Sequence, residues 1–93
     1  MNQPSVNVIK NNNKHEPFDA VKLHTSIYHA MLRLKNPDGS AHDTARHVVE
    51  MTIAWIDDKP EVTSKNLRTQ AAKFLSKYNQ EAAYLYKHHK HII

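Results

Sequence analysis

Residues 6–23 read VNVIKNNNKHEPFDAVKL, and this stretch decides the fold. At its start Val6, Val8 and Lys10 alternate with Asn7 and Ile9, an alternation typical of a short β-strand. The three asparagines at 11–13 predict a tight turn, because asparagine adopts left-handed backbone angles more readily than most residues. The segment therefore predicts a β-hairpin that needs no glycine.

A helix should follow the hairpin directly. Pro17 cannot donate a ladder hydrogen bond, so it should lie at the edge or the end of a strand. Asp19 is a favourable N-cap residue. After it, apolar residues recur at helical spacing, namely Leu23, Ile27, Ala30, Met31 and Leu34. The helix should end by Lys35 or Asn36, because the Asn-Pro-Asp-Gly sequence at 36–39 favours a turn.

A second helix is predicted in the middle of the chain. It should begin at Asp43 or Thr44, both of which are good capping residues. Its apolar stripe is Ala45, Val48, Val49, Thr52, Ile53 and Ile56. The Asp-Asp-Lys-Pro sequence at 57–60 should end it, and the residues at 61–63 should form a short extended segment.

Two more helices complete the predicted order. Thr63 or Ser64 should cap the third helix, and Asn79 should separate it from the fourth. Their apolar residues are Leu67, Ala71, Phe74 and Leu75 in the third, and Ala82, Ala83, Leu85 and Tyr86 in the fourth. Strands this short cannot bury a face by themselves, so they should lie across the helices. The pattern indicates a small, mostly helical α+β domain.

Composition sets the class of protein. The 93 residues support one domain, which we place at 6–91 after a polar tail at 1–5. The chain has no cysteine, which excludes a disulfide framework and a thiol nucleophile and is compatible with a cytoplasmic protein. No apolar run is long enough to span a membrane. The net charge of +4 favours anionic partners, namely nucleotides, nucleic acids or an anionic membrane surface, and it is equally compatible with solubility alone.

Three segments resemble a known family. The opening at 8–23 is similar to that of ATP-cone domains, which typically reads Val-x-Lys-Arg-Asp-Gly-x-x-Glu-x-Phe-Asp-x-x-Lys-Leu. The Val-Thr-Ser sequence at 62–64 resembles the stretch before the third helix of that family, and AAYLYK at 82–87 resembles its closing Ala-Tyr-x-x-Tyr-Arg element. The likeness covers roughly residues 6–90. ATP-cones are small regulatory domains best known from ribonucleotide reductases.

The resemblance implies a fold and a function. The fold would be a four-helix bundle capped by a three-stranded sheet, made of the hairpin and one more short strand. ATP or dATP, with Mg²⁺ as an optional companion, would bind beneath the sheet. Binding would change the oligomeric state of the chain itself or the activity of a reductase-related partner. Such a domain is a sensor and not an enzyme.

The resemblance also implies site residues. Lys10 and Lys22 correspond to lysines that contact phosphate, a dense anion that needs cationic donors. Glu16 and Asp19 correspond to positions that read the adenine edge. The remaining implied contacts are Val8, Phe18 and Leu23 for the base, with Asn11 and Thr63 nearer the phosphates. From their places in the chain, Arg68, one turn beyond Thr63, could reach a phosphate, and Lys87 or Lys90 could approach from the C-terminus. Simpler roles stay open: solvated lysines, an N-cap for Asp19 or Thr63, and a core position for Phe18.

One departure from the family pattern concerns the phosphate loop. The Arg-Asp-Gly of the family is Asn11-Asn12-Asn13 here, so a bidentate phosphate donor is missing. Lys14 restores a charge from the other side of the turn. We therefore expect triphosphate binding that is retained but weakened.

The sequence also allows us to weigh a histidine metal site, nucleic-acid binding and a purely structural role as alternatives to nucleotide binding. His24 and His29, like His42 and His47, are five residues apart, which is poor spacing for two metal ligands on one helix face; His88, His89 and His91 cluster at the end of the chain. No catalytic or phosphate-loop motif is present.

A basic face with Lys73, Lys77, Lys87 and Lys90 would instead suit nucleic acid. A structural role without nucleotide would use exposed aromatics, for which Trp55 and Tyr84 are candidates, although a place in the core is equally compatible with their sequence positions.

Overall fold

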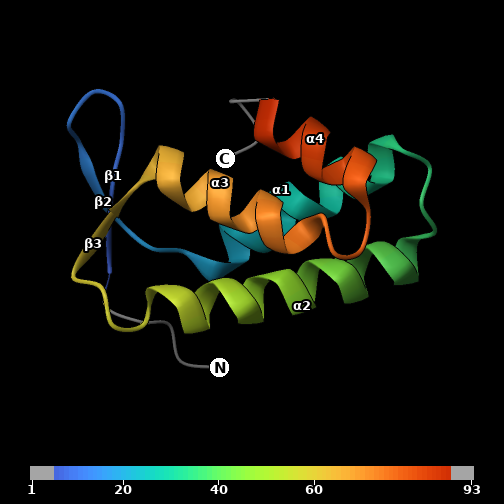
Figure 1. Cartoon of the computed structure of the whole chain (residues 1–93), viewed down its shortest axis with the longest axis horizontal. Coiled ribbons are helices and arrows are strands. Elements are labelled where there is room, and N and C mark those ends of the chain that lie inside the picture. Colours follow the sequence, from blue (N-terminus) through green and yellow to red (C-terminus); the bar gives the residue numbers. More distant parts are fainter. Residues whose placement is uncertain (1–5, 89–93) are drawn as a thin grey trace.

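The computed structural model describes residues 6–88 (Figure 1). In chain order the elements are β1 (Asn7–Ile9), β2 (His15–Pro17), α1 (Ala20–Arg33), α2 (Asp38–Ile56), β3 (Glu61–Thr63), α3 (Ser64–Leu75) and α4 (Gln80–His88). The predicted α+β class, with four helices and a three-stranded sheet, is confirmed. The predicted tail at 1–5, and the predictions for His89, Lys90 and His91, lie outside the described residues.

The sheet lies at one end of the helices and joins two distant parts of the chain (Figure 1). Its strand order is β2-β1-β3, with β1 antiparallel to β2 and parallel to β3. Val8 in the central strand is paired with Glu16 on one side and Val62 on the other. Pro17 ends the edge strand β2, as predicted, where its missing N–H costs no ladder bond.

The asparagine turn closes the hairpin without glycine. The Lys10 carbonyl accepts the N–H of Asn13 at 2.9 Å, and Asn13 adopts a left-handed φ of 63°. The side chain of Asn12 accepts the N–H of Lys14 at 3.1 Å. This is the arrangement of a three-residue hairpin loop, in which the last loop residue must tolerate positive φ. Asparagine meets that requirement at position 13.

Helix α1 begins and ends where the sequence predicts. Asp19 is its N-cap, and one carboxylate oxygen accepts the N–H groups of Val21 and Lys22 at 3.0 and 3.2 Å. After Arg33, both the backbone N–H and the side-chain amide of Asn36 donate to the Met31 carbonyl. These contacts satisfy backbone groups that have no partner inside the helix.

The predicted start of the second helix is wrong. Helix α2 begins at Asp38, five residues before the predicted cap at Asp43, and Pro37 precedes it. Proline is compatible with a helix start, because the first N–H groups of a helix have no partner within it. Asp38 in the first turn suits the positive end of the helix dipole and accepts a hydrogen bond from the Tyr28 hydroxyl. The Asn-Pro-Asp-Gly sequence is thus a helix start as well as a turn.

The four helices form a closed ring around one core. Helices α1 and α3 each contact both α2 and α4. The predicted apolar stripes supply the core, with fully buried members such as Ile27, Val48 and Leu75. Four stripe residues are only partly buried and pack against its edge: Leu34, Ile53, Phe74 and Leu85.

A buried hydrogen bond links α4 to α1. The Ser26 hydroxyl donates to the Leu23 carbonyl at 2.7 Å and lies 3.1 Å from the Tyr86 hydroxyl oxygen. Since the Ser26 proton is already committed, Tyr86 is the donor in the second contact. Tyr86 is completely buried, and burial raises the pKa of its phenol far above the usual 10.0, although the Ser26 hydrogen bond and the charge of Arg68 act in the opposite direction.

The first prediction concerns this contact. Tyr86→Phe should lower the free energy of unfolding by about 1 kcal/mol, because the substitution removes a buried hydrogen bond and leaves the Ser26 oxygen without its donor. Chemical denaturation measures the change. Tyr84→Phe is the matched control, because the Tyr84 side chain lies on the same helix but is 70% exposed. Equal stability of the two variants would contradict the role of the Tyr86 hydroxyl.

The raised pKa of Tyr86 also predicts a dependence on alkaline pH. The buried phenol binds its proton more tightly than the same group in the unfolded chain. Its contribution to stability is therefore complete below the usual pKa of 10.0 and is lost as the pH rises above that value. The stability difference between the native protein and Tyr86→Phe should therefore begin to shrink at about pH 10 and should continue to shrink as the pH rises further toward the raised pKa of the folded state. A constant difference over that range would contradict the assignment.

Candidate functional site

An apolar pocket lies between the hairpin, the start of α1 and the first turns of α3. Its volume is about 220 Å³. Apolar walls come from Val8, Phe18, Leu23 and Leu67, whose side chains are all buried in the core. Charged groups form the rest of the lining, together with Pro17: Lys10, Glu16, Asp19 and Lys22. The pocket therefore combines an apolar interior with a charged rim, as small-molecule sites commonly do.

Strand geometry directs the sheet residues into the pocket. Successive side chains of a strand point to opposite faces, so Val8 and Lys10 share the face that meets the helices. Glu16 is directly opposite Val8 in the register and lies on that face too. Asn7 and His15, which point to the other face, are exposed. The alternation seen in the sequence thus explains why these three side chains converge.

The start of α1 supplies the opposite rim. Asp19 commits one carboxylate oxygen to capping, so the simpler role considered for it is present in the structure. Lys22 lies in the first turn of the helix, which contains no acidic residue. A cation there faces the positive end of the helix dipole, an unfavourable arrangement unless an anion lies nearby.

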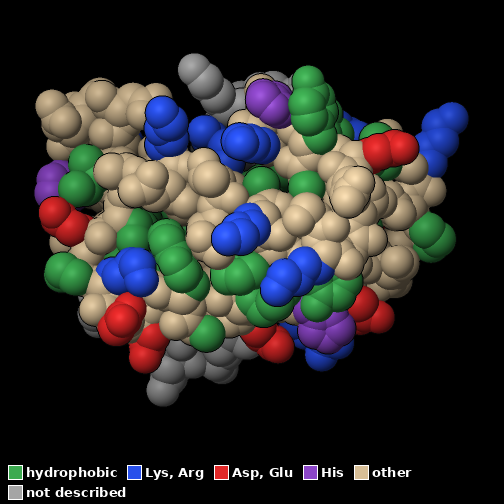
Figure 2. Space-filling view, viewed as in Figure 1, with side chains coloured by type: hydrophobic (Ala, Val, Ile, Leu, Met, Phe, Trp, Pro, Cys, Tyr) green, Lys and Arg blue, Asp and Glu red, His purple; other side chains and the backbone are tan. Residues whose placement is uncertain are grey.

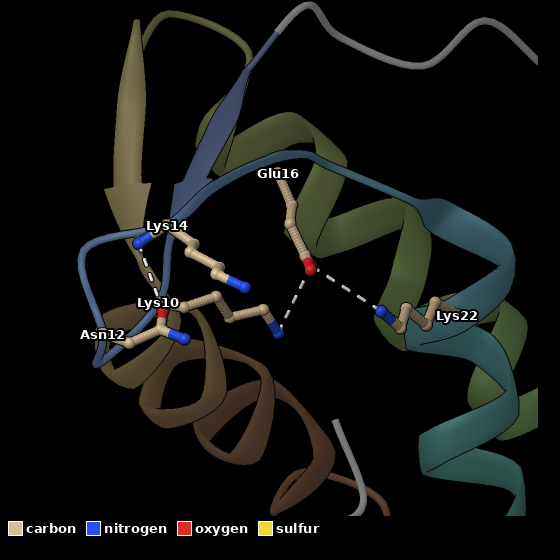
Figure 3. A network of polar contacts seen from close by, with 5 residues as sticks. All are labelled: Lys10, Asn12, Lys14, Glu16 and Lys22. Carbon is tan, nitrogen blue, oxygen red and sulfur yellow. Dashed lines mark hydrogen bonds and ion pairs between the residues drawn. The ribbon is translucent and has the colours of Figure 1, made fainter.

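Glu16 is that nearby anion (Figure 3). Its Oε2 lies 3.6 Å from Nζ of Lys10 and 3.7 Å from Nζ of Lys22. The side chain of Lys14 extends from the hairpin toward the same group (Figure 3). The structure therefore pairs one lysine from the hairpin and one from α1 with the same carboxylate, and Lys14 lines the depression beside them.

The pocket continues into two basic depressions. The first has a volume of about 450 Å³, shares Lys10 and Glu16 with the pocket, and reaches Arg68 on α3. The second, of about 290 Å³, shares Asn11 and Arg68 with the first and reaches Lys87 on α4. The three cavities thus form a track that leads from apolar walls to a cationic surface.

Most of the predicted site residues line this track. Seven lie around the apolar pocket: Val8, Lys10, Glu16, Phe18, Asp19, Lys22 and Leu23. Asn11, Arg68 and Lys87 line the basic depressions. Thr63 lines none of the three cavities. Its hydroxyl accepts the N–H of Asn66 at 3.0 Å and caps α3, which was the simpler of its two predicted roles.

Sequence reasoning missed several residues of the track. Leu67 was predicted only as part of a helical stripe, and Ser64 only as a helix cap. Lys65, Thr69 and His88 belong to no recognisable motif, and their place beside Lys87 depends on how α3 packs against α4. The helical spacing of Ser64, Lys65, Arg68 and Thr69 indicates one shared face of α3 and was the available sign.

Comparisons with known proteins do not identify the chain: no family model matches it, and neither the curated proteins nor the solved structures include a significant match. Within residues 6–88 no group of three or more His, Asp or Glu side chains is arranged to hold a metal ion. Nor does this part of the chain contain a helix long and apolar enough to cross a membrane. The geometry of the track is therefore the structural basis for assigning a function.

The capping role of Thr63 leads to a prediction. Thr63→Ala should lower the free energy of unfolding by about 0.5–2 kcal/mol, because an N–H of α3 loses its partner. It should leave the affinity for anions such as inorganic tripolyphosphate unchanged. Thermal and chemical denaturation measure the first effect and calorimetry the second. A loss of anion affinity with unchanged stability would show that Thr63 contacts the ligand instead.

Proposed function

We propose that this protein is an adenine-nucleotide-binding regulatory domain of the ATP-cone type. The observation that carries the proposal is the track from the apolar pocket to the basic depressions, and the family resemblance points to most of the residues that line the apolar pocket. ATP and dATP are the proposed ligands. The proposed consequence of binding is a change in oligomeric state or in the activity of a partner related to ribonucleotide reductase, in the cytoplasm.

The base would occupy the apolar pocket. Its volume of about 220 Å³ is below the roughly 300–1,000 Å³ of sites for whole drug-sized ligands, which suits one part of a nucleotide rather than all of it. The flat faces of a purine would contact Val8, Leu23 and Leu67. Asp19 has a second carboxylate oxygen beside the one used for capping, and this oxygen could accept the exocyclic amine of adenine. Guanine has a carbonyl at that position and would be disfavoured.

The phosphates would follow the cationic part of the track. Lys10 and Lys22 stand at the rim of the pocket, and Arg68 and Lys87 lie further along. Arginine can offer two parallel hydrogen bonds to a phosphate, so Arg68 partly offsets the arginine that is missing from the Asn11–Asn13 loop. Mg²⁺ would be held mainly by the phosphates. No covalent chemistry is proposed for the domain.

Titration calorimetry tests this function. ATP and dATP should bind saturably, with affinity exceeding that for GTP. Lys22→Ala should weaken ATP binding about tenfold, because a charge-assisted contact is lost. The side chain of Lys22 is 56% exposed, so the variant should still fold. Lys73→Ala removes an exposed lysine of α3 that lines none of the three cavities, and it should bind ATP normally.

The same titrations define failure. Absence of both heat and thermal stabilisation with ATP and dATP would refute nucleotide binding, and equal affinity for ATP and GTP would refute adenine selection. Light scattering with and without ATP tests the regulatory part of the proposal. An unchanged mass, with no effect on a reductase, would instead favour a structural role. Tyr84 is exposed enough to serve such a role, whereas Trp55 is only partly exposed and lies beneath Nζ of Lys59.

A second candidate is binding of single-stranded nucleic acid. Figure 2 shows Lys and Arg side chains along the face on which α3 and α4 lie. Lys73, Lys77 and Lys87 are exposed on or directly after these helices, as are the rings of Tyr78 and Tyr84. Cations beside exposed rings can bind a phosphate backbone and stack on bases. Binding of a short oligonucleotide that weakens steeply with salt and is unaffected by Lys22→Ala would favour this alternative.

A further inference from the structure

The position of Glu16 indicates a role for this residue in addition to lining the proposed nucleotide pocket. Its carboxylate lies between two ammonium groups that come from different elements, Lys10 after β1 and Lys22 in α1 (Figure 3). The family resemblance assigns Glu16 to the adenine edge. In the structure, the Oε2 atom faces the lysines at the rim of the pocket.

Electrostatics explains why a carboxylate lies at this position. Two lysines converge there, and the positive end of the α1 dipole adds to their charge. The first turn of α1 has no acidic residue of its own. The N-cap carboxylate of Asp19 offsets part of the helix dipole, and Glu16 is the carboxylate that pairs with the two lysines themselves. A phosphate group would satisfy the same requirement with more charge and more acceptor oxygens.

The Glu16 contacts are weak enough to be exchanged. At 3.6 and 3.7 Å, both N–O distances exceed those of a hydrogen bond. The side chains of Glu16 and Lys22 are 45% and 56% exposed, and that of Lys10 is 25% exposed. Ion pairs in such surroundings contribute little to stability, because water screens them. The carboxylate can leave the two lysines without disturbing the core.

We propose that Glu16 is an intramolecular counter-ion that occupies the anion position between Lys10 and Lys22, and that a bound phosphate group displaces it. This inference rests on the proposed function, in which these lysines receive phosphate. We add that Glu16 competes with the ligand for the two lysines, so phosphate binds only by displacing Glu16. Glu16 thereby sets the affinity of the site, and ligands with too little charge to replace a carboxylate are rejected.

Inorganic tripolyphosphate is the appropriate probe. It contains no base, so any contact between Glu16 and adenine cannot affect the result. Glu16→Gln keeps the shape of the side chain and removes its charge. Calorimetry should find that this variant binds tripolyphosphate about three- to tenfold more tightly than the native protein, since one surface ion-pair competitor has been removed.

Two further variants separate a local effect from a general one. Glu50→Gln changes the net charge equally, but its site is exposed in the middle of α2. The tripolyphosphate affinity of Glu50→Gln should remain within about twofold of the native value, because salt screens distant charges. The double variant with Glu16→Gln and Lys22→Met should show no gain in tripolyphosphate affinity, because it lacks the Lys22 ammonium group that the loss of the Glu16 charge would make available. Circular dichroism confirms that each variant is folded.

The outcomes distinguish this inference from the proposed function. Equal tripolyphosphate affinity of the native protein and Glu16→Gln would overturn the counter-ion role, even if ATP binds with adenine selectivity. An equal gain in affinity in Glu50→Gln would also overturn it. The same conclusion would follow if neither the native protein nor Glu16→Gln bound tripolyphosphate at millimolar concentration. A gain confined to Glu16→Gln would support the counter-ion role, even if ATP and GTP bind alike and the adenine proposal fails.

Discussion

The parallel pairing of β1 with β3 is the constraint on which the rest of this small domain depends. Strands of three residues are not stable by themselves, and a hairpin alone would be marginal. By pairing Val8 with Val62, the chain attaches its hairpin to the segment that leads directly into α3. The hairpin is thereby fixed over the starts of both α1 and α3. The apolar pocket exists because these three elements meet there.

Local chemistry explains how much of the fold could be predicted. Asn13, Asp19 and Thr63 each mark a turn or a helix start through a hydrogen bond or a backbone angle that involves only near neighbours. Helical spacing identified the core stripes for the same reason. The start of α2 was predicted wrongly because Pro37 is compatible both with the end of one helix and with the beginning of the next. In that case the packing of Ala41 and the contact between Asp38 and Tyr28 favour the longer helix.

The candidate site was less predictable, because its geometry depends on long-range packing. Strand alternation places Val8, Lys10 and Glu16 on one face, and this much follows from the sequence. No local pattern indicates that Lys22 approaches the same carboxylate, or that α3 and α4 extend the cationic surface. The family resemblance supplied most of the residues around the apolar pocket. It did not supply the orientation of Glu16, which depends on where the positive charges gather.

The buried hydrogen bond between Tyr86 and Ser26 has a consequence for communication through the domain. Ser26 in turn donates to the Leu23 carbonyl, and the Leu23 side chain is a wall of the pocket. The pocket and the last helix are thus joined by a short chain of hydrogen bonds inside the core. Thermodynamic coupling between two sites is reciprocal. If a ligand that moves Leu23 changes the affinity of α4 for a partner protein, then binding of that partner to α4 must change the affinity for the ligand by the same factor.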